Sequence, residues 1–334
     1  MMKLSTLWSL DQTYSADGRS PLVDRIAARW RHDLGSVRFF RSSANFVSLL
    51  GVDEERAFLR FASSTERSTQ HIRNELRLLQ RLTDAGHAVA RPRPSRTGNL
   101  METVQTNGGT FHAVVFDDLW GNPRELTELS LPCFEAWGGT VGALHATLAS
   151  CAVEVDHGAG KPTWQRALSH IAAHGQCLSP CVVREAARLR SVLSTLPADA
   201  SHYGLLHGDL ELDNLIWRKD GIAVLDFDGY STGWYMLDIA KALSEPLDAG
   251  MGPGSPEFGS FVTGYRREHA LTDESLALLP DFSSLSKMLD YASVHRALDT
   301  PAERAPVDWM RDLICRLQAG MHEYERECER INGG

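Results

Sequence analysis

The residues of this chain best suited to chemistry are an aspartate and an asparagine five positions apart, and a second aspartate that ends an apolar run. They lie in His207-Gly-Asp-Leu-Glu-Leu-Asp-Asn214 and in Ile222-Ala-Val-Leu-Asp226-Phe-Asp228. Transfer of a γ-phosphoryl group requires a carboxylate that orients the acceptor hydroxyl and takes its proton, and hard oxygen ligands that hold Mg²⁺ against the phosphates. The spacing predicts Asp209 for the first task, and Asn214 and Asp226 for the second.

The sequence around these residues predicts elements that hold them rigidly. Residues 222–225 are apolar and predict a buried strand that delivers the carboxylate of Asp226 at its end. The segment Lys219-Asp-Gly221 supplies the turn before that strand. A loop followed by a strand is therefore expected to bring the three side chains together.

The order H-G-D-x-x-x-x-N, then an apolar strand ending in D-F-D, resembles the aminoglycoside phosphotransferase and choline kinase superfamily. The stretch Phe58–Arg67 is similar to that of a bacterial branch that includes type II homoserine kinases, and the resemblance runs from about Val37 to the end of the chain. It implies an α+β fold, bilobal and protein-kinase-like, with ATP as co-substrate and Mg²⁺ as the metal. It also implies that His207 braces the catalytic loop rather than reacting.

The boundary between the two lobes is expected at residue 118. Residues 1–118 predict a small amino-terminal lobe, made of an antiparallel sheet with a leading helix, that binds the nucleotide. Residues 119–334 predict a larger, mainly helical lobe for catalysis and acceptor binding. A chain of 334 residues, 43% of them hydrophobic, is long enough to bury two cores around a cleft. Strands are predicted at residues 37–40, 46–50, 57–61 and 111–116, and helices at residues 69–82 and 134–149.

A polar connection between the first two predicted strands lies where a protein kinase has its glycine-rich loop. It reads Arg41-Ser-Ser-Ala-Asn45 and contains no glycine. Its short polar residues Ser42, Ser43 and Asn45 can still offer hydroxyls and backbone N–H groups to phosphates. An ordinary hairpin turn would have the same sequence, and the resemblance to kinases favours phosphate binding.

The third predicted strand carries an arginine where the superfamily commonly has a phosphate-binding lysine. Residues 31–118 contain no lysine, and Arg60 occupies the position. A guanidinium can fork onto phosphate oxygens, so Arg60 is expected to replace the lysine, with Glu75 as its ion-pair partner. The alternatives are that Arg60 is a solvated strand residue and Glu75 an exposed helical charge. Phe116 is expected to border the nucleotide at the hinge, residues 117–123.

The charge of the chain is unevenly distributed. Residues 1–118 contain 16 Lys and Arg against 13 Asp and Glu, whereas residues 119–334 contain 18 against 30. The acidic second part favours a cationic small-molecule acceptor and disfavours nucleic acid as a partner. The alternative is that the acidic surface confers solubility only.

Three acids after the catalytic motif are expected on the acceptor side: Asp228, Asp238 and Glu245. The run Gly233–Glu245 resembles a helix of choline kinase-like enzymes in which an aspartate braces the catalytic loop and an acid seven residues later faces the acceptor. Seven residues make about two helical turns, which predicts Asp238 and Glu245 on one face. Trp234, Tyr235, Tyr291 and Trp309 could supply aromatic walls for a cationic group, and packing in the core is the alternative role for each of them.

Several protein classes are disfavoured by the sequence. No apolar run approaches the length of a membrane span, and Met1–Leu10 is too short and too polar for a secretory signal. A cytoplasmic protein without a membrane partner is expected. The six cysteines lack paired metal-binding spacing, so free thiols are predicted.

The sequence therefore predicts an ATP- and Mg²⁺-dependent phosphotransferase that acts on a hydroxyl of a small molecule. The expected acceptor bears an amine, as an amino alcohol, a hydroxy amino acid or an aminoglycoside does. Three alternatives stay open: a Ser/Thr protein kinase of the same fold, a catalytically silent nucleotide-binding regulator, and a nucleotidyltransferase. The choice between ATP and GTP and the oligomeric state are also left open.

Overall fold

The structure, a computed structural model, describes residues 1–52, 55–151 and 163–332. Two compact units make up the chain. The first comprises residues 1–77, 90–118 and 293–320, and the second comprises residues 78–89, 119–292 and the chain from 321 onward. One division between the units lies after residue 118. Residues 78–89 precede it and belong to the second unit, and residues 293–320 follow it and belong to the first.

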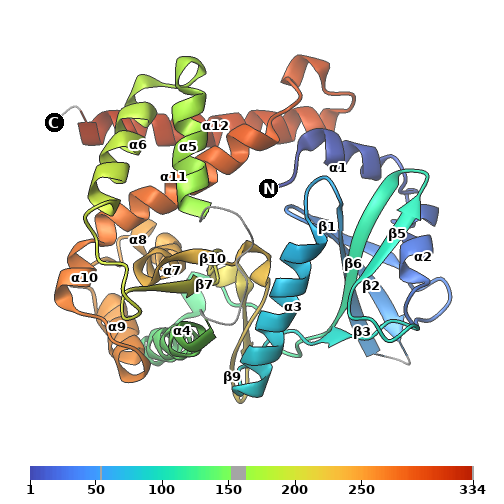
Figure 1. The fold of residues 1–334 in the computed structure, drawn as a ribbon, viewed down its shortest axis with the longest axis horizontal. Coiled ribbons are helices and arrows are strands. Elements are labelled where there is room, and N and C mark those ends of the chain that lie inside the picture. The colour runs from blue at the N-terminus through green and yellow to red at the C-terminus, as the bar shows by residue number, and fades with distance from the viewer. Residues whose placement is uncertain (53–54, 152–162, 333–334) are drawn as a thin grey trace. The chain divides into compact units, whose positions relative to one another are not determined.

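The first unit is built on an antiparallel sheet (Figure 1). Its strands are β1 (Arg38–Ser42), β2 (Phe46–Val52), β3 (Glu55–Ser63), β4 (Pro92–Arg93), β5 (Glu102–Thr106) and β6 (Gly109–Asp117). They lie in the order β1-β2-β3-β6-β4, and β5 pairs with β6 as well. Buried and less buried residues alternate along β2, which is the pattern of a strand with one face in a core. The predicted strands at 37–40, 46–50, 57–61 and 111–116 are confirmed within a few residues.

The first unit also contains helices. They are α1 (Leu4–Asp11), α2 (Pro21–Ala27), the first half of α3 (Thr69–Asp84) and the start of α12 (Asp308–Asn332). Helix α2 begins where the Ser20 hydroxyl accepts the N–H of Val23, and it buries Val23, Ile26 and Ala27 in the core of the sheet. The amino terminus of Met1 donates to the Ser293 hydroxyl at 3.0 Å.

The second unit is mainly helical. Its helices are α4 (Leu131–Cys151), α5 (Thr163–Ala173), α6 (Pro180–Leu193), α7 (Tyr235–Ala242), α8 (Ser244–Asp248), α9 (Pro256–Glu268), α10 (Asp273–Ala277) and α11 (Leu279–Ala297). Helices α4 and α9 pack so closely that a Cβ on Gly138 would overlap the carbonyl of Phe261, and one on Gly264 that of Glu135. Small residues at these positions therefore bring the two backbones together.

Two short strand pairs within the second unit frame the predicted catalytic loop. Strand β7 (Tyr203–Leu206) pairs with β10 (Ser231–Trp234), and β8 (Leu215–Arg218) pairs with β9 (Gly221–Val224). The loop that starts at His207 follows β7 directly, and Asp226 comes shortly after β9. The predicted strand before Asp226 and the turn at residues 219–221 are confirmed.

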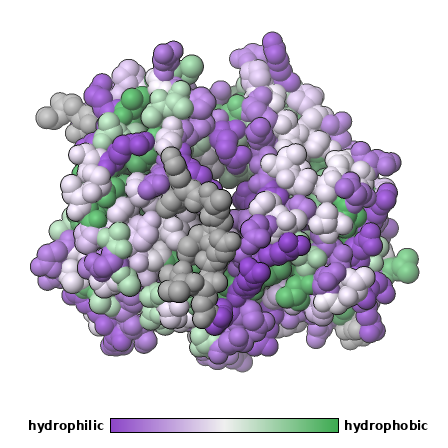
Figure 2. All heavy atoms as spheres, in the orientation of Figure 1, coloured by the Kyte–Doolittle hydropathy of each residue, from purple (hydrophilic) through white to green (hydrophobic). Residues whose placement is uncertain are grey.

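A sheet in one unit and helices in the other confirm the predicted α+β class. Figure 2 shows that hydrophilic side chains cover most of the visible face and that hydrophobic ones form small scattered groups. Among the described residues, no helix has both the length and the apolar character needed to cross a membrane.

Candidate active site

A buried aspartate holds the backbone of the catalytic loop. The carboxylate of Asp238, on α7, accepts the N–H of His207 at 2.7 Å and the N–H of Gly208 at 2.9 Å. The Nε2 atom of His145 lies 3.2 Å from the same carboxylate. Burial alone would raise the pKa of Asp238, but the hydrogen bond and charge of His145 and the loop N–H groups hold it below its usual value. Asp238 thus remains ionised beneath the loop.

Asp228 and Asp238 are predicted to contact the acceptor, and both are buried, at 5% and 0% exposure. The partners of Asp238 given above, His145 and the N–H groups of His207 and Gly208, lie under the loop. Contact of either carboxylate with an acceptor stays a prediction, and it requires that these side chains become exposed.

His207 connects the catalytic loop with the segment that follows β9. Its Nε2 atom is 2.7 Å from the carbonyl oxygen of Leu225, and its ring lies 4.4 Å from that of Phe227. Gly208 has a positive φ of 83°, and a Cβ there would overlap the carbonyl oxygen of Gly229. The two predicted motifs are therefore in direct contact, and His207 lies in the bracing position that the resemblance implied.

Asp209 and Asn214, the predicted proton acceptor and a predicted metal ligand, contact each other in this loop. The amide nitrogen of Asn214 donates to the carbonyl oxygen of Asp209 at 2.7 Å and lies 3.3 Å from its carboxylate. Burial raises the pKa of Asp209 above that of an ordinary aspartate, while the charge of Lys241 opposes the shift. The carbonyl of Asn214 accepts the N–H of Leu225 at 2.8 Å, which places Asp226 next to the loop.

Asp226 adopts a left-handed backbone conformation, with φ of 57°, and is the one non-glycine residue with positive φ in the described part of the chain. Aspartate is among the few residue types that tolerate this region. The conformation turns the chain sharply after β9, into the short 3₁₀ turn Phe227–Gly229. A residue in such a conformation at the end of a strand is typical of a functional position.

Asn214 and Asp226 are the predicted metal ligands, and an amide oxygen and a carboxylate are donor types that suit Mg²⁺. Asn214 commits its amide nitrogen to Asp209, so its side-chain oxygen is directed elsewhere. Mg²⁺ is usually held by one or two side chains together with phosphate oxygens and waters. Among the described residues no group of three or more His, Cys, Asp and Glu side chains gathers around a point suited to a metal.

No role was predicted for Lys241, which lies beside Asp209 in the structure. Its ammonium lies 2.7 Å from Glu211, 2.9 Å from Asp290 and 3.8 Å from Asp209. The one signal in the sequence was a charged residue inside the apolar helical stretch 239–243. The contact of His145 with Asp238 spans 93 positions of sequence.

Glu245 is exposed, on a different helix from Asp238. Helix α7 ends at Ala242 and α8 begins at Ser244, so the predicted shared helical face is wrong. Burial, followed by the negative charges of Asp213, Glu125 and Glu211, raises the pKa of Glu245. This part of the second unit therefore has a negative potential.

The predicted nucleotide residues of the first unit form a compact group. Two nitrogens of Arg60 donate to the two carboxylate oxygens of Glu75, with Nη1 to Oε1 at 2.8 Å. The guanidinium carbon lies 4.9 Å from the centre of the Phe116 ring. Glu75 is completely buried, so it is not the exposed helical charge of the alternative interpretation. Phe116 is buried below Arg60 and supports it.

The turn between β1 and β2 contains both exposed and buried side chains. Ser43 is exposed and Ser42 half-buried, whereas Asn45 is 5% exposed. The amide nitrogen of Asn45 is buried and has no hydrogen-bond partner in the structure. The carbonyl of Ser43 accepts the N–H of Met2 at 3.1 Å. Ser42 and Ser43 are accessible to a ligand, whereas the side chain of Asn45 would first have to move.

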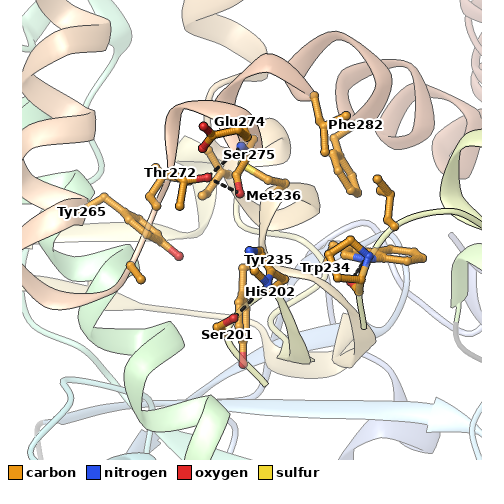
Figure 3. Close-up of a pocket in the computed structure, with 16 residues that line it drawn as sticks. Ser201, His202, Trp234, Tyr235, Met236, Tyr265, Thr272, Glu274, Ser275 and Phe282 are labelled. Carbon is orange, nitrogen blue, oxygen red and sulfur yellow. Dashed lines mark hydrogen bonds between the residues drawn. The ribbon is translucent and has the colours of Figure 1, made fainter. Parts of the chain in front are cut away.

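A separate cavity of about 240 Å³ lies in the second unit, and Figure 3 shows aromatic side chains around it, among them Trp234, Tyr235, Tyr265 and Phe282. His202, which lines the cavity, lies at the amino-terminal end of β7. The loop that starts at His207 lies at the carboxyl-terminal end of the same strand. Trp234 and Tyr235 therefore line this cavity. Tyr291 is buried and donates to Glu325, and Trp309 contacts Trp8 in the first unit. These contacts agree with the packing role that the sequence left open for Tyr291 and Trp309.

Comparison with known proteins adds to this geometry. A model of the phosphotransferase enzyme family matches residues 36–274. Amicoumacin kinase from Bacillus subtilis (strain 168) is 28% identical over 290 residues, which cover 83% of this chain and 85% of that protein.

Solved structures confirm the kinase-like fold. The amicoumacin kinase hAmiN in complex with AMP-PNP, Ca2+ and Ami superimposes with a TM-score of 0.76 over 96% of each chain, at 23% identity. The microcompartment-associated aminopropanol kinase superimposes with a TM-score of 0.65 at 24% identity, over 90% of this chain and 94% of that one.

Proposed function

Because this chain belongs to the phosphotransferase enzyme family and is a kinase that acts on small molecules, we propose that it transfers the γ-phosphate of ATP, with Mg²⁺, to a hydroxyl of an amine-bearing acceptor. The observation that carries the proposal is the contact of Asp209 with Asn214 on a loop held by Asp238. Phosphoryl transfer depends mainly on positioning and charge, and this loop provides both.

Asp209 is the residue that receives the acceptor hydroxyl. Its carboxylate orients the O–H group toward the phosphorus and takes the proton as the new bond forms. Asn214 and Asp226 are the residues that would hold Mg²⁺, which when bound neutralises charge on the phosphate oxygens. The amide of Asn214 also fixes the backbone of Asp209, so the proton acceptor and a metal ligand keep a constant separation.

Arg60 is the proposed phosphate clamp of the first unit. Its guanidinium is oriented by two hydrogen bonds to Glu75 and supported by the ring of Phe116. A guanidinium that is already oriented loses little side-chain entropy when it binds a phosphate. Ser42 and Ser43 are proposed as additional phosphate contacts, as their exposure permits.

The proposed amine of the acceptor rests on the electrostatics of the second unit. Burial and the neighbouring negative charges of Asp213, Glu125 and Glu211 raise the pKa of Glu245. These carboxylates together would attract a cation. The excess of acids in residues 119–334 acts in the same direction. Aminopropanol, which the name of one structural relative gives as its substrate, bears both a hydroxyl and an amine.

The proposal is tested with pairs of acceptors that differ only in the amine. We expect ADP release and phosphorylated product with 1-amino-2-propanol, homoserine or an aminoglycoside, and much lower kcat/KM with the matched neutral alcohols, such as 1,2-propanediol. Equal kcat/KM within each pair would remove the amine from the proposal. Label in proteins of a lysate, with no small molecule phosphorylated, would favour the protein kinase alternative.

A further inference from the structure

Lys241 is a buried lysine whose ammonium group lies among three carboxylates. Two of them belong to the catalytic loop: Glu211, at 2.7 Å from Nζ, and Asp209, at 3.8 Å. The third is Asp290 on α11, at 2.9 Å. An ammonium has three N–H donors, so one lysine can contact all three side chains at once.

Lys241 differs from a surface lysine because it is buried among apolar residues. The residue is 8% exposed, and its helical neighbours Ala240 and Ala242 are buried apolar residues. Lysine is rarely buried to this extent unless it is paired. Burial alone would lower the pKa of Lys241, but the charges of Asp290 and Glu211 more than offset this and raise it. The ammonium is therefore charged at neutral pH.

The position of this charge matters for a reaction that brings phosphates to Asp209. Asp209 and Glu211 are two residues apart in one loop, and Asp226 lies close enough to add its negative charge. An anionic phosphoryl group would be repelled by these carboxylates. The ammonium of Lys241 contacts Asp209 and Glu211 and offsets part of their charge.

We propose that Lys241 is a positioning residue for phosphoryl transfer, which orients the carboxylates of Asp209 and Glu211 and reduces the negative charge that the incoming phosphate meets. This inference rests on the proposed role of Asp209 in the transfer. A merely structural lysine would instead serve to tie α11 to the loop, and its contact with Asp290 would then be the important one.

The two roles predict different effects of single substitutions. We expect Lys241→Met to lower kcat by about 10²-fold, the scale of a misplaced catalytic group, with the KM for ATP changed less than about threefold. Lys241→Arg should recover part of the loss, since the charge survives. Asp290→Asn leaves the contacts with Glu211 and Asp209 in place and should change kcat less than about threefold.

Two further variants sharpen the comparison. Lys287→Met is the matched control, because Lys287 is another lysine of the second unit that pairs with two acids, Glu327 and Asp248. It should leave kcat unchanged. Adding Glu211→Gln to Lys241→Met removes surplus negative charge and should restore part of kcat. If Lys241→Met does not fold, as judged from its thermal unfolding, the double variant compared with Glu211→Gln alone measures the same effect.

The proposal is overturned if Asp290→Asn lowers kcat as much as Lys241→Met does, or if Lys241→Met and the parent have the same kcat. These measurements use whichever acceptor the parent phosphorylates best, and also the slow transfer to water. An acceptor that proves neutral would therefore contradict the proposed acceptor class without affecting this test. Parent-like turnover by Asp209→Asn would instead contradict the proposed function itself.

Discussion

The carbonyl oxygen of Gly229 fills the space that a side chain on Gly208 would need. Gly208 also has a φ of 83°, a conformation that glycine adopts at little cost. The loop that carries Asp209 therefore lies directly on the turn that follows Asp226. This contact explains how two motifs separated in sequence can hold their carboxylates in one place.

Gly208→Ala should disturb this contact and reduce activity. The added methyl group meets a backbone carbonyl and forces an unfavourable φ, which costs about 1–3 kcal/mol of stability. We expect a lower thermal unfolding midpoint and a kcat reduced about tenfold or more. The control is Gly259→Ala on α9, where a Cβ meets no atom within 4 Å. That variant should be as stable as the parent or slightly more so, and equal effects of the two substitutions would argue against the proposed contact.

Asp226→Asn should abolish metal-dependent ATP binding while leaving the fold intact. Asparagine tolerates the left-handed conformation of residue 226 but lacks the charge of the carboxylate. Asp226→Ala should lose both the metal and some stability, because alanine tolerates this conformation poorly. Calorimetric titration of ATP with and without Mg²⁺, together with thermal unfolding, separates the two effects. Undiminished Mg·ATP binding by Asp226→Asn would exclude this residue as a ligand.

Arg60→Ala should reduce both stability and ATP use. Removal of the guanidinium leaves the carboxylate of Glu75 buried without its cation, a change that typically costs about 3–5 kcal/mol. Arg60→Lys should retain part of the activity, because the ammonium keeps the positive charge but cannot form the two parallel hydrogen bonds of a guanidinium. The two effects are separated by adding Glu75→Gln to Arg60→Ala, which removes the buried charge. If the KM for ATP returns to the parent value in that double variant, Arg60 is not the phosphate clamp.

Glu245→Gln should raise the KM for an amine-bearing acceptor and spare the KM for ATP. The residue is exposed, so the expected effect is modest, about two- to fivefold, as for an ion pair in water. Burial and the charges of Asp213, Glu125 and Glu211 raise the pKa of Glu245, so its negative charge is lost at a higher pH than that of an ordinary glutamate as the pH falls. The acceptor KM should rise over that range in the parent but not in Glu245→Gln. Glu268→Gln, at the exposed end of α9, is the control.

The parts of the site that are local in sequence could be predicted, and the parts that depend on distant segments could not. The spacing of Asp209 and Asn214 and the strand before Asp226 are local patterns. The Lys241 contact with Asp290 and the His145 contact with Asp238 join residues 49 and 93 positions apart. Neither contact can be recognised from the neighbouring residues in the sequence, because the same residues would be found if each side chain were simply packed in the core.

One error could have been avoided from the sequence alone. The residues from Asp238 to Glu245 were treated as one continuous helix, although Pro246 follows directly. Proline has no N–H to donate to the carbonyl four residues earlier, which is that of Ala242, and its ring crowds that carbonyl. Helix α7 ends at this residue, and the new helix α8 starts at Ser244. The place of residues 293–320 in the first unit could not be predicted from local sequence. It depends on contacts with the start of the chain, such as that of Met1 with Ser293.

The measurement that tests the account most directly is transfer of label from ATP to an amine-bearing alcohol by the parent and by Asp209→Asn. With label in the γ-phosphate, the parent should yield a phosphorylated alcohol and ADP, whereas Asp209→Asn should be slower by about 10²-fold or more, with nearly unchanged ATP affinity. With label in the α-phosphate, no label should reach the product. Turnover by Asp209→Asn at the parent rate, or label transferred from the α-phosphate, would contradict the account.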